Sequence, residues 1–264
     1  MILLHNRKER SETKSMSPAP KPHRKSIAIM QPVFLPWLGY FEQIGVTDTF
    51  MFLDDVQYTK QDWRNRNRIR TKTGWMWLTV PVRKAGHDQP ISETQIDGAF
   101  WKRKHVKSLQ QNYARAPYYA DIMALIEPHI WAQQTTLIGL TESLIESMAS
   151  YLSIGGVFLR ASDVPKSTQD RNERLIELCQ HAGADCFFTG PAANDYLDHE
   201  LFARHGISVV FQDYIHPVYP QAFDSFESHM SVLDLLMNHG PASTEFLLSS
   251  PRPPGLIGEG DKRS

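Results

Sequence analysis

Basic side chains occupy every second position in one short stretch of the chain, residues 64–72. Alternate residues of an extended chain point to the same side, so these charges would stand next to one another and repel. A phosphate or carboxylate among them would offset the repulsion, because the planar fork of arginine matches both groups. Trp63, Asn65 and Asn67 interleave with the charges and favour such a ligand site over a solvated sheet edge that merely prevents strand pairing. The basic residues are Arg64, Arg66, Arg68, Arg70 and Lys72.

A histidine follows a predicted strand in the sequence DYIHPVYPQ. The free pKa of histidine lies near neutrality, which makes His216 a candidate general acid or base. Asp213 and Tyr214 precede it, Tyr219 follows, and Pro217 restricts the backbone next to it. The alternative is a histidine that is hydrogen-bonded within a turn.

Two adjacent carboxylates, Asp54 and Asp55, end another predicted strand. Neighbouring side chains of a strand point to opposite faces, so one carboxylate can face a pocket while the other caps a turn. No third ligand stands at a motif spacing, and no metal site is predicted. Ser167 and Thr168, which precede a predicted helix, suit either an anion site or a helix cap.

The two cysteines, Cys179 and Cys186, are too few for a disulfide framework or a metal cluster. Cys179 lies late in a predicted helix, on the same apolar stripe as Leu175, whereas a nucleophilic cysteine needs a helix N-terminus or a basic neighbour. Core packing is therefore favoured over a thioester-forming role. Two free thiols fit a reduced, cytoplasmic setting.

Charge is distributed unevenly along the 264 residues, whose formal net charge is -1. Residues 7–25 hold seven of the 28 Lys and Arg but only two of the 29 Asp and Glu, so the remainder is mildly acidic and nucleic-acid binding is not expected. No apolar run reaches the ~18 residues of a membrane span. We predict a disordered basic tail over residues 1–25, one domain over 26–245 and a flexible C-terminal tail over 246–264.

Short apolar runs alternate with amphipathic stretches, most regularly in the second half of the chain. This alternation predicts an α/β, Rossmann-like fold with a mainly parallel sheet, flanking helices and a helical insertion in the middle of the chain. Strands are expected within residues 26–30, 48–55, 76–82, 157–164, 185–190 and 207–214. Helices are expected within residues 38–45, 100–114, 136–152, 167–183 and 196–206.

The stretch QPVFLPWLGYF, residues 31–41, follows the first predicted strand. Ligands of parallel sheets bind beyond the carboxyl ends of the strands, which is where this turn must lie. We expect Gln31 to hydrogen-bond a ligand, Trp37 and Tyr40 to form an apolar wall, and Gly39 to allow a close approach.

Several stretches together resemble the WbqC-like protein family, from about Ser26 to about Pro241. They are IAIMQPVFLPWLGYFEQI, DDVQYTKQDWRNRNRI, WLTVPV, GADCFFTGPAANDYLD, ISVVFQDYIHPVYPQ and SVLDLLMNHGP. Members are bacterial proteins often found with genes for O-antigen, lipopolysaccharide and other surface polysaccharides, or with other biosynthetic clusters, so the resemblance implies a role there. Val33 and Trp37 depart mildly from it, since they replace aromatics that are commonly seen there in the family.

The leading hypothesis is a cytoplasmic biosynthetic transferase that moves an acyl, aminoacyl or sugar-modifying group onto a nucleotide-linked or carrier-linked intermediate. In it, His216 takes a proton from the acceptor and Asp54 or Asp213 orients this histidine. No cofactor is identified, and the expected partner is a substrate that carries phosphate or carboxylate. The expected substrate-binding residues are Gln31, Trp37, Tyr40, Gln57, Arg66, Asn67, Arg68, Lys72, Tyr214 and Tyr219.

Two alternatives come from other classes of protein. A nucleotidyltransferase is suggested by the strand, turn and helix around MQPVFLPWLGYF, residues 30–41, although the paired histidines of such enzymes are absent. A non-catalytic scaffold of a glycan assembly complex is suggested by the aromatic and arginine content. Catalysis predicts that Asp54, Arg66 and His216 meet at one pocket, whereas a scaffold predicts a broad exposed apolar patch.

Overall fold

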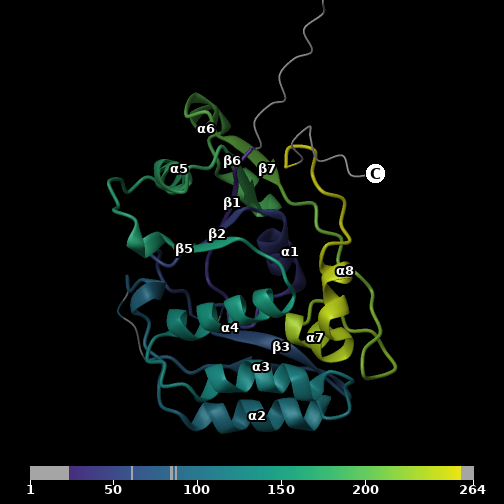
Figure 1. Ribbon diagram of the computed structural model, residues 1–264. Helices are drawn as coiled ribbons and strands as arrows, with labels where there is room; N and C mark the ends of the chain where they lie inside the picture. The colour runs from purple at the N-terminus through teal and green to yellow at the C-terminus, as the bar shows by residue number, and fades with distance from the viewer. Residues whose placement is uncertain (1–23, 61, 84–85, 87, 257–264) are drawn as a thin grey trace, which may run out of the picture.

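The computed structural model describes residues 24–60, 62–83, 86 and 88–256. Its centre is a five-stranded sheet in which each neighbouring pair of strands is parallel (Figure 1). The order across the sheet is β5-β2-β1-β6-β7. The strands are β1 (Ser26–Met30), β2 (Thr49–Phe52), β5 (Val157–Arg160), β6 (Cys186–Thr189) and β7 (Ser208–Phe211).

The strand order shows where the chain reverses its direction across the sheet. After β1 the chain adds β2 and β5 on one side, and it then adds β6 and β7 on the other side of β1. This is the Rossmann-like α/β arrangement that the sequence predicts, and the prediction is confirmed. Ligands of such sheets bind outside the carboxyl ends of the strands at the reversal, which here lies between β1 and β6.

Alternate residues of the central strands face two separate cores. Ile27, Ile29 and Met51 belong to one apolar cluster, whereas Ala28 and Phe50 belong to the other. Helices α5 and α6 pack on the first face, and α1 packs on the second. These helices are α1 (Leu38–Val46), α5 (Arg171–His181) and α6 (His199–Arg204).

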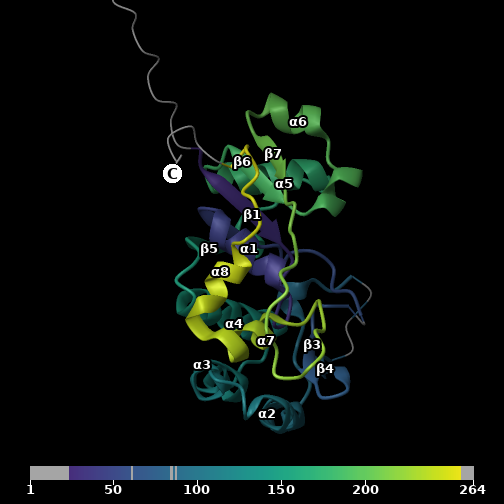
Figure 2. The ribbon, with the colours of Figure 1, turned by 90° about the vertical axis from the view of Figure 1, so that its right-hand side faces the viewer.

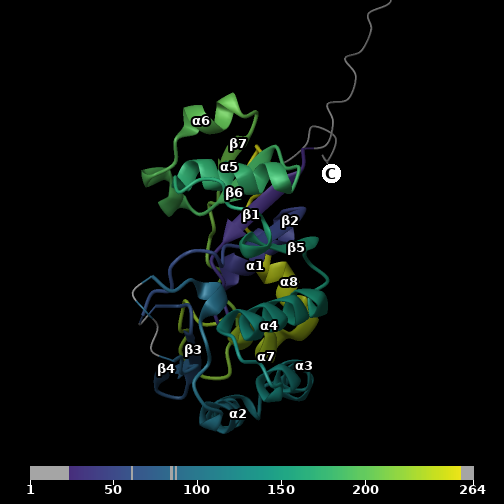
Figure 3. The ribbon, with the colours of Figure 1, turned by 90° about the vertical axis from the view of Figure 1, so that its left-hand side faces the viewer.

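A hairpin and several helices form a second part of the molecule below the sheet (Figures 1 and 3). The antiparallel hairpin follows β2, three helices follow the hairpin, and the chain then returns to the sheet as β5. The first of two C-terminal helices packs against this part, and the second packs against the first and against α1. The predicted mid-chain helical insertion is thus confirmed. The elements are β3 (Arg66–Thr71), β4 (Gly74–Thr79), α2 (Phe100–Tyr113), α3 (Tyr119–Trp131), α4 (Leu137–Tyr151), α7 (Val232–His239) and α8 (Ser243–Leu247).

Several boundaries differ from the sequence prediction. Helix α5 begins after Asp170, whose carboxylate accepts the N–H groups of Asn172 and Glu173 at 2.8 and 3.0 Å, and not after Ser167 or Thr168. A carboxylate at the N-cap satisfies amide donors that the helix leaves free, so the cap lies closer to the apolar stripe than expected. Helices α3 and α7 were not predicted.

Parts of both predicted tails lie outside the described residues. These parts are residues 1–23 of the basic tail and residues 257–264 of the C-terminal tail. Leu247, at the end of α8, is fully buried, two residues beyond the predicted domain boundary. Among the described residues no helix combines the length and apolar character needed to cross a membrane.

Candidate functional site

Four side chains from separate parts of the chain line a cavity of about 270 Å³. They are Trp37 at the start of α1, Trp63 before β3, Arg68 in β3, and His229 between β7 and α7. The yellow-green segment after β7 runs down to the hairpin (Figure 2), where Ser231 donates its N–H to the Arg68 carbonyl at 2.9 Å. The cavity therefore forms where the turn after β1, the hairpin and the segment after β7 meet.

The guanidinium of Arg68 lies among indole rings and has no ion pair within the described residues. Its central carbon is 5.0 Å from the ring centroid of Trp75, 5.4 Å from Trp63 and 6.0 Å from Trp77. Cation–π contacts stabilise the charge but leave the N–H donors unused, and Arg68 Nε is buried without a hydrogen-bond acceptor. An oxyanion in the cavity would supply both the acceptor and the opposite charge.

The neighbouring basic residues have other surroundings. Arg64 forms an ion pair with Asp62 at 3.4 Å. Arg66 lies over the ring of Trp77, at 4.4 Å from its centroid, and does not line the cavity. Lys72 is exposed in the turn after β3, so the alternation of basic residues ends with the strand. Strand β3 spans Arg66–Thr71, so only three of the five basic residues stand at alternate positions of one extended segment. The expectation that all five do so is therefore wrong.

Arg70 is the clearest departure, since its side chain is fully buried. It donates to the Gly74 carbonyl at 2.7 Å and to the Ser225 carbonyl and hydroxyl at 2.6 and 2.9 Å. These bonds fasten the segment after β7 to the hairpin. Arg70 is thus a structural residue, whereas Arg68, two positions earlier on the same face of the strand, is open to a ligand.

Two histidines form a contact pair beside the cavity, with ring centroids 4.9 Å apart. His216 Nδ1 lies 3.0 Å from the Pro217 carbonyl oxygen, and His216 Nε2 accepts the His229 N–H at 3.2 Å. A carbonyl only accepts, so Nδ1 carries the proton and the His216 ring is neutral. Burial also lowers the pKa of His216. His229 lines the cavity, and within the described residues only its Nδ1 is bonded, at 2.7 Å from Ser228 Oγ.

Trp37 and Tyr214 stand next to each other above Gly39. A Cβ atom on this glycine would lie 3.0 Å from Tyr214 Cδ1 and 3.1 Å from Trp37 Nε1, which only glycine avoids without displacing the rings. Burial raises the pKa of Tyr214. The Tyr214 hydroxyl and Gln31 Oε1 are buried without a hydrogen-bond partner, which is unusual in a native structure and makes both candidates for bonds to a ligand.

All four residues that line the cavity fall within a match to a known family. The model of the WbqC-like protein family matches residues 31–246. The chain belongs to the WbqC-like protein family. The uncharacterized protein Rv1507c of Mycobacterium tuberculosis is 40% identical over 226 residues, which are 84% of this chain and 97% of that protein. No solved structure matches the chain.

The predicted catalytic carboxylates of this WbqC-like protein do not line the cavity. Asp54 is fully buried, and its two oxygens accept the Ser162 N–H at 2.9 Å and the Ser162 hydroxyl at 2.7 Å, which joins β2 to the turn after β5. Asp55 pairs with Arg174 at 3.0 Å. Asp213 is exposed after β7. Catalytic roles for Asp54 and Asp213 stay predictions.

Three predicted substrate-binding residues are almost fully buried and hold the backbone around the cavity. The Tyr40 hydroxyl donates to the Gln31 carbonyl at 3.3 Å. The Asn67 amide donates to the Phe34 carbonyl at 3.3 Å and accepts the Arg68 N–H at 2.8 Å. Tyr219 donates to a buried carboxylate described below. Direct contact of these three residues with substrate stays a prediction, as does that of the exposed Gln57.

The two cysteines are both free and fully buried. Burial raises the pKa of Cys179 to about 12. Cys179 packs with Leu175 in the cluster below α5 and takes no part in the cavity. Among the described residues no group of three or more His, Cys, Asp or Glu side chains suits a metal ion.

The sequence does not single out His229 as a site residue. It stands in FESHMSV, between a polar loop and the serine that begins α7, with no motif spacing around it. Its φ of 61° lies in the left-handed region, which a histidine adopts rarely and which no propensity argument anticipates. The signal that was present is the tryptophan content of residues 63–77, since three indoles surround the one arginine that lines the cavity.

Proposed function

We propose that this WbqC-like protein is a group-transfer enzyme whose substrate carries a phosphate or carboxylate that binds Arg68. The observation that carries the proposal is the Arg68 guanidinium, which lines a cavity and lacks a carboxylate partner within the described residues. The Nε atoms of Arg68 and Arg70 are both buried without an acceptor. The terminal nitrogens of Arg70 donate to carbonyl and hydroxyl oxygens of the fold, whereas the Arg68 guanidinium has aromatic rings around it and only the backbone N–H of Arg68 donates within the described residues.

His229 supplies the acid–base group of the proposed reaction. It lines the same cavity as Arg68, and its Nε2 has no hydrogen bond within the described residues. In the transfer, Nε2 takes the proton from the hydroxyl or amine of the acceptor as that atom bonds to the transferred group. The bond from that group to its carrier breaks, and the leaving group receives the proton from His229.

His216 has a different part in this scheme from the one that the sequence suggested. Both of its nitrogens are engaged with backbone groups, so it cannot take a proton without losing the bond from the His229 N–H. It supports the residue that exchanges protons. The proposed chemistry therefore keeps the histidine-containing segment and moves the proton-transfer step from residue 216 to residue 229.

The setting that we propose is the cytoplasmic assembly of O-antigen, lipopolysaccharide or related surface polysaccharides. The support is membership of the WbqC-like family and the two free buried thiols, which a reducing compartment preserves. A scaffold role is favoured by one observation only: Ile215 and Val218 are 60% and 76% exposed on the segment that carries His216. That surface would suit the docking of a carrier as well as that of a structural partner.

Thermal-shift measurements test the anion site, because a ligand that binds the native state raises its melting temperature. The panel holds nucleotide sugars, acyl-CoA, ATP, sugar phosphates and uronic acids, each with its uncharged analogue. At least one anionic compound is expected to stabilise the wild type and Arg103→Met, an exposed control on α2, but not Arg68→Met. Flat melting curves throughout, or an undiminished shift in Arg68→Met, would reject the proposed site.

A further inference from the structure

A buried carboxylate joins three parts of the molecule behind the cavity. Asp234, on α7, is fully buried. Its Oδ1 accepts the Tyr113 hydroxyl of α2 at 2.9 Å, and its Oδ2 accepts the Tyr219 hydroxyl and the Gln221 amide at 2.9 and 2.8 Å. Three donors for one buried charge satisfy it well. Two of the three come from the segment between β7 and α7, the segment that also carries His229.

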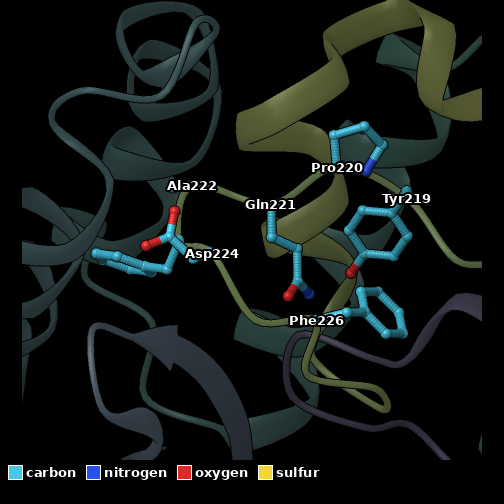
Figure 4. A pocket seen from close by; sticks show the side chains of 7 residues that line it. Tyr219, Pro220, Gln221, Ala222, Asp224 and Phe226 are labelled. Carbon is cyan, nitrogen blue, oxygen red and sulfur yellow. The ribbon is translucent and has the colours of Figure 1, made fainter.

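Figure 4 shows how that segment is folded around a second cavity, of about 310 Å³. The Tyr219 hydroxyl and the Gln221 amide turn to the same side of it. The Gln221 amide also closes the loop, since it donates to the Glu227 carbonyl at 2.9 Å and accepts the Glu227 N–H at 2.8 Å. Arg70 donates to the carbonyl and the hydroxyl of Ser225 in the same loop. The loop is thus held from inside by Gln221 and from the hairpin by Arg70.

His229 comes two residues after this closed loop and has a strained backbone. Its φ is 61°, a conformation that costs a residue with a Cβ atom energy and persists only where the surroundings enforce it. Contacts on both sides of His229 hold it in this conformation. The His229 N–H is held by His216, and two residues later Ser231 bonds to the Arg68 carbonyl and pairs with Trp37.

We propose that Asp234 is a positioning residue: by fixing Tyr219 and Gln221, it holds the loop that sets His229 against the Arg68 cavity. The proposal rests on the proposed function only in giving His229 its acid–base role. The positional claim concerns the loop itself and can be measured without a substrate.

The competing explanation is that Asp234 merely joins α7 to α2 as part of the core. The two tyrosines separate these explanations, because each gives one phenolic hydrogen bond to the same carboxylate. Tyr219 lies in the segment that leads to His229, whereas Tyr113 lies in α2. The Tyr113 hydroxyl also accepts the Arg70 N–H at 2.9 Å, so Tyr113→Phe removes more bonding than Tyr219→Phe does. A core role predicts the larger effect for Tyr113→Phe in every measurement.

The test is the rate at which diethyl pyrocarbonate modifies His229 in the full-length protein, with the modified residue located by tandem mass spectrometry. Tyr219→Phe is expected to change the rate by about fivefold, which is what the loss of one net hydrogen bond does to a local equilibrium. Gln221→Ala is expected to change it by at least as much, since it removes three hydrogen bonds. Tyr113→Phe is expected to leave the rate unchanged while it lowers the melting temperature at least as much. Asp234→Asn is expected to behave like Tyr219→Phe, and the two milder variants decide the matter if it does not fold.

Equal modification rates in Tyr113→Phe and Tyr219→Phe would overturn the proposal, as would an unchanged rate in folded Tyr219→Phe and Gln221→Ala. The imidazole signals of His229 in proton–carbon correlation spectra give an independent measure, since a displaced ring loses the ring-current shift from His216, whose ring centroid lies 4.9 Å away. Failure of the proposed function is separate: it would appear as the absence of any Arg68-dependent thermal shift and would leave these rates as they are.

Discussion

His105 gives this protein a calculable sensitivity to acid. The residue is 4% exposed, and its ring packs against those of Trp101 and Phe34 with centroid distances of 4.9 and 5.7 Å. Its Nε2 lies 3.1 Å from the Thr79 carbonyl oxygen. Nε2 therefore donates, and Nδ1 is buried with no partner. A proton on Nδ1 would be a buried charge without an acceptor, so burial lowers the pKa of His105 from 6.5 to about 4.

The direction in which pH changes the stability follows from which state, native or unfolded, binds the proton first as the pH falls. As the pH falls below 6.5 the unfolded chain protonates this histidine, and the native state does so only near pH 4, so acid destabilises the fold across that window. Each pKa unit corresponds to about 1.4 kcal/mol, which makes the complete loss about 3 kcal/mol and the loss between pH 7 and pH 5 about 2 kcal/mol. That is a sizeable part of the ~5–15 kcal/mol that stabilises a typical domain.

The assay is urea unfolding followed by circular dichroism at pH 7, 6 and 5, for the wild type and His105→Gln. Glutamine can still donate to the Thr79 carbonyl but does not titrate, and every other ionisable group is common to both proteins. The free energy of unfolding of the wild type is expected to fall by about 2 kcal/mol more than that of the variant between pH 7 and pH 5. Parallel pH profiles for the two proteins would contradict this prediction, because His105 would then titrate alike in the native and the unfolded state.

Three further predictions concern the site and its supports. Cys179→Ala is expected to keep full activity in the host pathway, measured as polysaccharide production, and native Cys179 is expected to resist iodoacetamide because burial raises its pKa to about 12; loss of activity in that variant would revive a thioester mechanism. Arg70→Met is expected to lower the free energy of unfolding by at least ~2 kcal/mol in urea titrations, roughly the cost of leaving buried carbonyls unpaired. Arg68→Met is expected to lower it by less than ~1 kcal/mol. Similar losses in the two variants would mean that both arginines are structural. His229→Gln is expected to abolish complementation of a deletion strain at normal protein levels, and wild-type complementation by this variant would remove His229 from the chemistry.

Much of the fold follows from local patterns in the sequence. The apolar run of β1, the alternating strands and helices after β5 and the stripe of α4 all match the expected elements within a few residues. These succeed because a strand or helix that packs on a core must repeat its apolar residues with a period of 2 or 3.6. Helix α3 was missed although its sequence is apolar, and it contains Pro128 in its last turn, where proline interrupts the pattern that marks a helix.

Local patterns predict the candidate site less completely than the fold. Local patterns place basic residues in alternation with tryptophan and asparagine in residues 63–70, and they place Trp37 and His216 in the segments that follow sheet strands. They could not tell Arg68 from Arg70, because both stand on the same face of β3. The folded chain distinguishes them, because the loop closed by Gln221 supplies acceptors to Arg70 through Ser225, whereas Arg68 lines the cavity. The same loop brings His229 to the cavity from 161 positions further along the chain, through contacts that no local pattern encodes.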